Sequence, residues 1–316
     1  MANRKIFMIA ALVGLMATSA MASSFRSADV VYLPVAGKTP AGNNAFFRTD
    51  VWIANVSNQP VVVDVAFARQ GQNNENVTDP ANTRRLPVFE PGERREIVDI
   101  MLQVFGQADS TDPATGTVGQ LIFFACREGG NCTACDTNAA DCLPITVEAR
   151  IYTTDAAGAT FGQLIPGIPW FNFVSPDAIT EQLHQVFITG IRENINYRTN
   201  IGIVNASQFS SAVVTARLFQ SNGQQFGATV TVSLPPLGFS QQSVADLFPG
   251  FTGTGAWVLL EQQPISSGSD PGFLAYGSLL DNKSNDPTYL EAQYIPVLDF
   301  GCIYGAKPIK RLVRRD

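Results

Sequence analysis

The stretch RTDVWIAN at residues 48–55 recurs later in the chain as RTNIGIVN at residues 198–205. Both copies begin with Arg-Thr, end with asparagine and place apolar residues at alternating positions in between. Alternation of this kind is typical of a half-buried β-strand, because successive side chains point to opposite faces of a sheet. The recurrence therefore predicts that one β-structure is built twice.

The similarity continues on the C-terminal side of both copies. Each is followed by a second alternating stretch, then by a Pro/Gly turn with a short apolar segment, and later by further apolar strands. The offset between matching residues is 150 for Arg48 and Arg198 but 126 for Ala149 and Ala275. We therefore expect insertions in copy one.

Turns rich in Gly, Pro, Asn and Asp divide each copy into about seven short strands, which is typical of an immunoglobulin-like β-sandwich. The sequence thus predicts an all-β protein with two tandem immunoglobulin-like β-sandwich domains from an internal duplication. One continuous double barrel with a shared core is the alternative. The predicted parts are a signal peptide (1–22), repeat 1 (23–169), a linker (170–182), repeat 2 (183–298) and a basic tail (299–316).

The linker carries three aromatic residues, Trp170, Phe171 and Phe173. Leaving three rings exposed is costly, so we expect them to pack between the domains rather than to form an aromatic platform for sugars or a partner.

Residues 1–22 have the features of a secretory signal peptide, with a basic start, the apolar run Ile6–Met16 and small residues at Ala20–Ala22. The apolar run is shorter than the ~20 residues that a spanning helix needs, which favours cleavage over a membrane anchor. We expect an exported protein, periplasmic, secreted or at the cell surface, with no transmembrane segment in the mature chain.

The chain holds 21 Lys and Arg against 27 Asp and Glu, a formal net charge of −6. An acidic body repels phosphate backbones, so nucleic acid is not an expected partner. The basic C-terminal tail, which includes Lys307 and Lys310, is either a solvated end or a contact for anionic lipid or polysaccharide.

Four cysteines, Cys126, Cys132, Cys135 and Cys142, fall in an insertion of repeat 1 that spans residues 126–142. Export favours disulfides among them. A bond between Cys126 and Cys142 would close the base of the loop and leave an inner pair, but the sequence leaves the connectivity open. A four-thiolate metal site is the alternative, although it usually needs two C-x-x-C pairs and only one is present. Cys302 is the remaining thiol, which is free, paired with a partner chain, or bonded to the cysteine loop if the C-terminal segment folds back.

Two stretches resemble a group of uncharacterised exported bacterial proteins with two tandem β-sandwich repeats. They are the Arg-Thr-Asp/Asn strand ending in Asn55 or Asn205 and the segment Tyr276–Asn282 running into Asp286-Pro287. The resemblance implies an extracytoplasmic β-protein and carries no known activity. Copy one departs from the pattern at Tyr152–Asp155, so a ligand role for the late segment would rest on copy two.

Residues that recur in both copies are expected to share a structural task, because chemistry is rarely duplicated within one chain. They are Arg48, Asp50, Asn55, Arg198, Asn200 and Asn205. The oxygens of Asp281, Asn282 and Asp286 suit either a weak calcium site or a hydrogen-bonded turn, but the segment lacks the glycine and the final glutamate of a calcium loop. We expect no cofactor.

No catalytic constellation stands out, since His184 is the only histidine and no nucleophile elbow is present. We therefore expect a non-catalytic binding, adhesion or structural module that contacts protein or glycan at the cell surface. The alternative is a polysaccharide hydrolase that uses two carboxylates, such as Glu90 with Glu93 or Asp281 with Asp286.

Sheet edges also leave room for self-association. Lysine commonly protects exposed edge strands, and we expect no strand to contain one. Cys302 would then be placed to lock neighbouring subunits. The lysines of the mature chain are Lys38, Lys283, Lys307 and Lys310.

Overall fold

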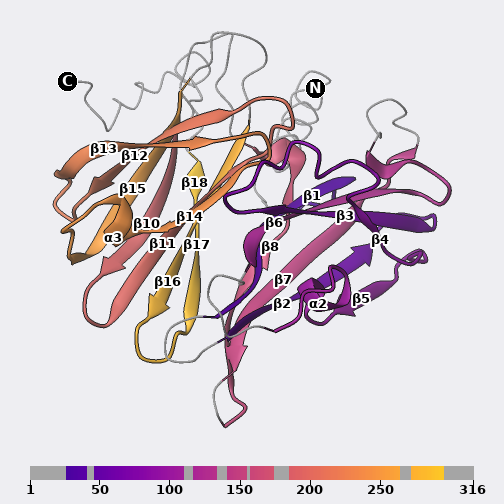
Figure 1. Cartoon of the computed structure of the whole chain (residues 1–316), viewed down its shortest axis with the longest axis horizontal. Helices are drawn as coiled ribbons and strands as arrows, with labels where there is room; N and C mark the ends of the chain where they lie inside the picture. Colours follow the sequence, from indigo (N-terminus) through magenta and orange to yellow (C-terminus); the bar gives the residue numbers. More distant parts are fainter. Residues whose placement is uncertain are drawn as a thin grey trace, which may run out of the picture.

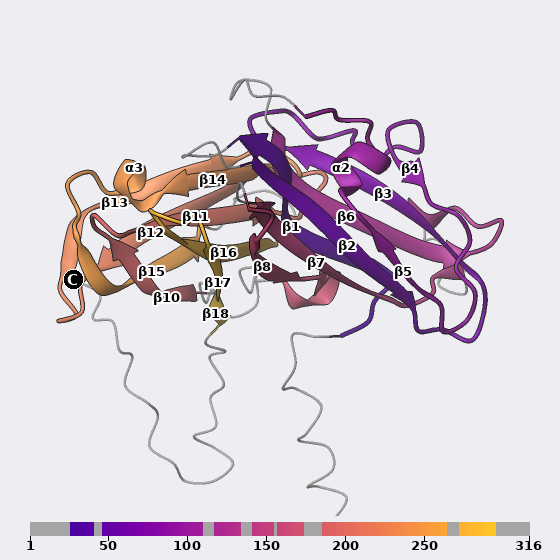
Figure 2. The same ribbon diagram turned by 90° about the horizontal axis from the view of Figure 1, so that it is seen from below.

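The computed structural model describes residues 26–40, 46–109, 117–133, 141–154, 157–173, 185–263 and 272–294. The predicted signal peptide, His184, Cys135, Cys302 and the basic tail lie outside these residues. The described chain is all-β and forms two halves that lie side by side (Figures 1 and 2). Within it, no helix has the length and apolar character needed to cross a membrane.

The first half pairs its strands in two antiparallel groups, β4-β3-β6-β1 with β9 against β1, and β5-β2-β7-β8. The two groups join where the end of β1 pairs with the start of β2, at Thr39–Phe47 and Pro40–Phe46. The elements are β1 (Val30–Pro40), β2 (Phe46–Asn55), β3 (Val61–Arg69), β4 (Arg84–Arg85), β5 (Arg94–Ile97), α2 (Ile100–Gln103), β6 (Thr117–Arg127), β7 (Ile145–Thr154), β8 (Thr160–Pro166), β9 (Ile168–Pro169) and the 3-10 turn η6 (Trp170–Asn172).

The second half contains a five-stranded sheet, β13-β12-β15-β10-β18, and a four-stranded sheet, β14-β11-β16-β17. Apart from β1–β2, each strand pairing of the first half has a counterpart here in the same chain order. The elements are β10 (Gln185–Glu193), β11 (Tyr197–Asn205), β12 (Ala212–Phe219), β13 (Gln225–Leu234), β14 (Phe239–Ser243), α3 (Val244–Leu247), β15 (Gly253–Gln262), β16 (Phe273–Asp281), β17 (Pro287–Glu291) and β18 (Gln293–Tyr294).

Alternating apolar residues supply the core of each half, as their period requires. In the second half, Val214 of β12 and Val258 of β15 are fully buried in one cluster with Ile201 of the opposite sheet. Burial between two sheets is the β-sandwich arrangement.

A second buried cluster runs from the first half into the second. It contains Tyr32 and Val35 of β1 together with Val204, Leu274 and Tyr276 of β11 and β16. Buried apolar residues therefore continue across the junction between the two halves.

The three linker aromatics separate at this interface. Phe173 is partly buried and packs edge-on against Tyr32, with ring centroids 4.5 Å apart, as expected for a residue packed at the junction. For Trp170 and Phe171 that expectation is wrong, since they are 52% and 43% exposed. The indole of Trp170 donates a hydrogen bond to Asp29 at 3.1 Å, and this contact holds the η6 turn at the surface.

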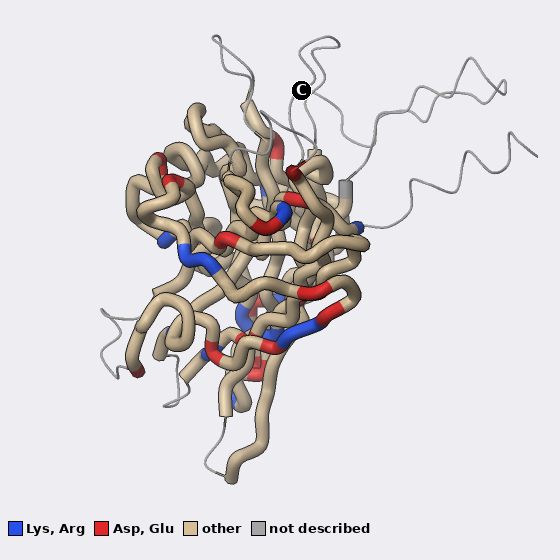
Figure 3. Tube along the Cα trace, turned by 90° about the vertical axis from the view of Figure 1, so that its right-hand side faces the viewer, with Lys and Arg blue, Asp and Glu red and all other residues tan. Residues whose placement is uncertain are grey.

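The expectation that no strand contains a lysine is also wrong. Lys38 lies in β1, but its side chain is 1% exposed and forms ion pairs with Asp99 at 2.5 Å and Asp109 at 2.8 Å. This lysine therefore stabilises the interior of the first half and protects no edge. Acidic and basic positions are interspersed along the described trace, with long uncharged stretches between them (Figure 3).

Candidate binding groove between the halves

The recurring asparagines make matching hydrogen bonds. The Asn55 amide donates to the carbonyls of Gln59 at 2.8 Å and Phe89 at 3.0 Å, while its oxygen accepts the Ser57 N–H at 2.8 Å. Asn205 donates to Ser210 and Pro235, both at 2.8 Å, and accepts the Ser207 N–H at 3.0 Å. Each amide thus ties the turn after its strand to the next loop, and both side chains are buried.

The threonines beside the recurring arginines also match. The Thr49 hydroxyl accepts the N–H of Gly37 and donates to its carbonyl, both at 2.9 Å. Thr199 makes the same two bonds with Arg192 in β10, at 3.0 and 2.7 Å. These bonds fasten β2 to β1 and β11 to β10, which is a structural task.

The two arginines find different partners. Arg48 binds Asp109 at 2.7 Å, and this hydrogen bond raises the pKa of the guanidinium. Beside it, Asp50 accepts the Asp99 N–H at 2.8 Å, and burial raises the pKa of Asp50. Asn200 stands at the position of Asp50 in β11, where it lies opposite Ser243 and Ser278. The carboxylate of Asp50, which is bonded to the Asp99 N–H in the first half, is therefore replaced by the neutral amide of Asn200 in the second half.

The late segment of copy two forms a hydrogen-bonded turn. Arg198 donates to the side-chain oxygens of Asn282 at 2.7 Å and Asn285 at 2.8 Å. Asp281 accepts the N–H groups of Lys283 and Ser284, which lower its pKa. The positively charged guanidinium of Arg198, bound to the side-chain oxygens of Asn282 and Asn285, repels a cation from this turn. The exposed Asp286 donates its own N–H to Ser284 within the same turn. Across the described residues, no cluster of three or more His, Cys, Asp or Glu is arranged to hold a metal.

One disulfide is present among the described cysteines, between Cys126 and Cys132, whose Cα atoms lie 4.8 Å apart. The pairing of Cys126 with Cys142 considered above is not formed. Cys142 lies opposite Cys126 in a backbone bridge, while a turn at Gly129, with φ of 80°, returns the chain so that Cys132 reaches Cys126.

Replacing Cys132 with serine is expected to lower the free energy of unfolding by about 2 kcal/mol, since a short loop is no longer closed in the unfolded chain. Peptide mapping without reductant should recover the Cys126–Cys132 link in the wild type. Alkylation of both thiols in unreduced, folded protein would contradict the assignment.

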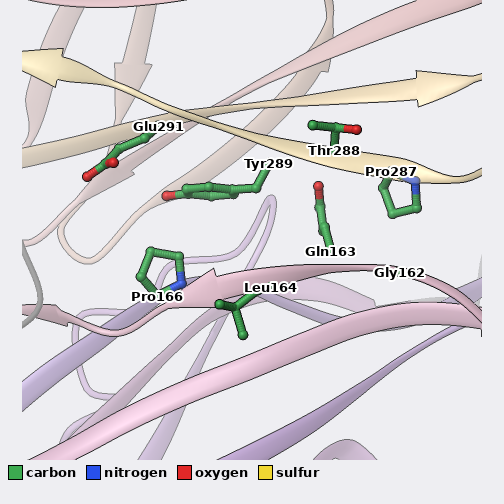
Figure 4. A pocket seen from close by; sticks show the side chains of 8 residues that line it. All are labelled: Gly162, Gln163, Leu164, Pro166, Pro287, Thr288, Tyr289 and Glu291. Carbon is green, nitrogen blue, oxygen red and sulfur yellow. The ribbon is translucent and has the colours of Figure 1, made fainter.

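A groove of about 380 Å³ opens between the edge strands β8 and β17, one from each half (Figure 4). The Cα traces of the two strands approach to within 8 Å but form no β-ladder with each other. The groove thus lies at the seam where two sheets end. Its lining residues are Gly162, Gln163, Leu164, Pro166, Pro287, Thr288, Tyr289 and Glu291.

Tyr289 forms the aromatic wall of the groove, and a buried tyrosine supports it from the core side. The Tyr289 ring stacks on Tyr276 at 5.8 Å, and Tyr276 is fully buried with its hydroxyl donating to Gln241 at 2.6 Å. Burial raises the pKa of Tyr289, so its hydroxyl stays protonated at neutral pH. Gln163 is fixed by hydrogen bonds of 3.2–3.3 Å to Ser278 across the seam.

None of the groove residues was singled out from the sequence. The predicted carboxylate pairs lie elsewhere, with Glu93 bound to Arg95 at 2.5 Å and to the Glu90 N–H at 2.7 Å, and with Asp281 in its turn. A signal for the groove was the place of its two strands in the fold. β8 is the edge strand of the sheet that contains β2, and β17 is the edge strand of the sheet that contains β11, where β2 and β11 are the two copies of the recurring strand.

Comparisons with known proteins assign no family. No protein-family model matches the chain, and no curated protein does. Among solved structures, Streptomyces avermitilis alpha-L-rhamnosidase, complexed with L-rhamnose, is 11% identical, with 85% of this chain and 28% of that chain covered and a TM-score of 0.19. The C-terminal domain of the Streptococcus pyogenes antigen I/II-family protein AspA is 9% identical, with 85% and 99% covered and a TM-score of 0.17. Pleurotus ostreatus lectin is 9% identical, with 87% and 84% covered and a TM-score of 0.18. Similarities this low give the chain neither a fold family nor a function.

Proposed function

We propose that this chain is an exported, non-catalytic binding protein, built from two duplicated immunoglobulin-like sandwiches, that holds a glycan in the groove between β8 and β17. The observation that carries the proposal is the groove itself, which brings one edge strand of each half to a common opening. Concave sites at the junction of two structural units are common places for ligands.

Duplication is supported by matching details in the two halves. Their strand pairings follow the same order, and Asn55 and Asn205 tie equivalent turns by equivalent hydrogen bonds. In this proposal the recurring motif is structural, and binding arises where the two copies meet.

The chemistry of the groove favours a sugar. A sugar ring has an apolar face and a polar edge, and the groove offers the same division, with the Tyr289 ring beside the polar groups of Gln163, Thr288 and Glu291. A two-carboxylate hydrolase needs a second acid within about 5–10 Å of the first. Of the described residues that line the groove, Glu291 is the one carboxylate.

Substituting Thr288 with arginine is expected to weaken glycan binding about tenfold or more, because a long side chain on an exposed lining position fills the groove. The measurement is binding of the mature protein to an array of neutral oligosaccharides, followed by titration of the best one. Tyr289→Ala should weaken binding as well.

Phe209→Ala provides the matched control, since Phe209 is 87% exposed in the turn after β11 and does not line the groove. It should bind as the wild type does. Equal binding by Thr288→Arg and wild type would contradict the groove as the binding site. Retention of surface proteins, with no oligosaccharide bound, would contradict a glycan as the ligand.

A further inference from the structure

The outer edge of the five-stranded sheet, β13, is unusually open. It spans Gln225–Leu234 and, among the strands that the structure describes, pairs on one side only, with β12. Thr229, Thr231 and Ser233 are exposed, while Val232 and Leu234 point into the core at 6% and 2% exposure. Figures 1 and 2 label this strand at the outer end of the second half, and the loop that follows it reaches the first half, where the Leu237 carbonyl accepts hydrogen bonds from Asn74 and Gln120. The free side of β13 therefore presents a long row of backbone donors and acceptors.

The first half handles the same sheet position differently. There β4, which pairs with the counterpart of β12, is only Arg84–Arg85, and Arg85 forms an ion pair with Asp64 at 2.8 Å. A short edge with two charges resists the addition of another strand. The chain thus protects this edge in one half and leaves it open in the other.

Charge is also missing along β13 itself and in the turns on either side of it. No Asp, Glu, Lys, Arg or His occurs between Arg217 and Asp246. Because the chain has a net charge of −6, two copies repel each other overall, and an uncharged edge adds no local repulsion to a contact between them. This feature favours a second copy of the same chain as the occupant.

Residues at both ends interrupt the free edge of the strand. Gly227, with φ of 67°, lies at the irregularity in the β12–β13 pairing, and Pro235 follows the strand. The stretch between them, Ala228–Leu234, has Thr231 at its centre, and its part Val230–Leu234 is in continuous register with β12. An antiparallel pair of such stretches would be centred on Thr231.

We propose that β13 pairs antiparallel with β13 of a second copy, about a two-fold axis at Thr231. In this register Thr229 lies opposite Ser233 on the outer face, and Val230 opposite Val232 on the inner face. Pairs of hydroxyl residues and of β-branched residues directly opposite each other stabilise a ladder. The two five-stranded sheets join into one, and the self-complementary contact closes as a dimer.

The dimer is independent of the groove. β17 belongs to the other sheet of the second half, and β8 to the first half, so pairing through β13 leaves the groove open. Failure of glycan binding and failure of dimerisation are therefore separate results.

A cysteine at the two-fold axis tests the register directly. In an antiparallel ladder, opposite Cα atoms lie about 4.5–5.5 Å apart, within the range that a disulfide spans. Mature Thr231→Cys protein should form a covalent dimer under mild oxidation, beyond any seen for the wild type on a non-reducing gel. Thr229→Cys should not, because its two copies lie roughly 13 Å apart in this register.

Light scattering across a concentration series then measures the assembly. The wild type should be a dimer, and Thr231→Lys should shift the association constant by about tenfold or more toward monomer, because two like charges become opposite neighbours. Ser221→Lys adds the same charge in the exposed turn before β13 and should stay dimeric. A monomeric wild type, open-ended aggregates, or equal cross-linking at positions 229 and 231 would overturn the proposal.

Discussion

Alanine in place of Asn205 is expected to lower the free energy of unfolding by about 2–4 kcal/mol, because a fully buried amide loses three hydrogen bonds. The cost exceeds that of the bonds themselves, since the carbonyls of Ser210 and Pro235 lose the donor that satisfies them. Urea denaturation, followed by tryptophan fluorescence and circular dichroism together, measures the loss.

Asn55→Ala is the matched substitution and should cost a similar amount, since its donors and acceptor are arranged in the same way. Asn222→Ala, in the exposed β12–β13 turn, should change stability by less than about 0.5 kcal/mol. A loss at only one of the two buried positions would contradict a shared structural role for the motif.

The strand motif could be predicted because its signal is local. Val51 and Ile53 alternate with less buried neighbours in β2, as Ile201 and Ile203 are buried in β11. A period-two pattern shows which residues of a single strand face the core, and this can be read from the sequence without knowing the rest of the fold.

The alignment of the later strands was wrong by two residues. Arg48 lies opposite Tyr152, whereas Arg198 lies opposite Leu280, so the structural offset there is 128 and not the 126 inferred from Ala149 and Ala275. A shift of two residues keeps every side chain on its original face. The hydrophobic pattern is unchanged by such a shift and cannot detect it.

The groove and the disulfide depend on contacts that no local pattern encodes. β8 and β17 meet only because the two halves pack through Tyr276, Leu274 and their neighbours. In the cysteine loop, the positions of Cys126 and Cys142 on neighbouring strands suggested that these two residues pair. The turn at Gly129 instead places Cys132 within bonding distance of the Cys126 sulfur. Long-range packing and positive-φ turns decided these outcomes.

The aromatic support of the groove depends on a missing side chain. Gly202 of β11 faces the Tyr276 ring so closely that a Cβ at this position would lie 2.0 Å from the ring. The ring has little room to move, because it is fully buried, its hydroxyl is bound to Gln241, and Tyr289 stacks on it. An overlap at Gly202 is therefore transmitted to the interface and to the wall of the groove.

Gly202→Ala is accordingly expected to destabilise the protein by roughly 3 kcal/mol, at the upper end of overpacking effects, and to weaken the proposed glycan binding through displacement of Tyr289. Thermal unfolding and titration of the same sample measure the two consequences. A double-mutant cycle identifies the cause: in a Tyr276→Ala background the glycine substitution should cost much less, whereas in Tyr276→Phe, which keeps the ring, it should cost as much as in the wild type. Equal costs in all three backgrounds would mean that the glycine serves the backbone of β11 and not the tyrosine ring.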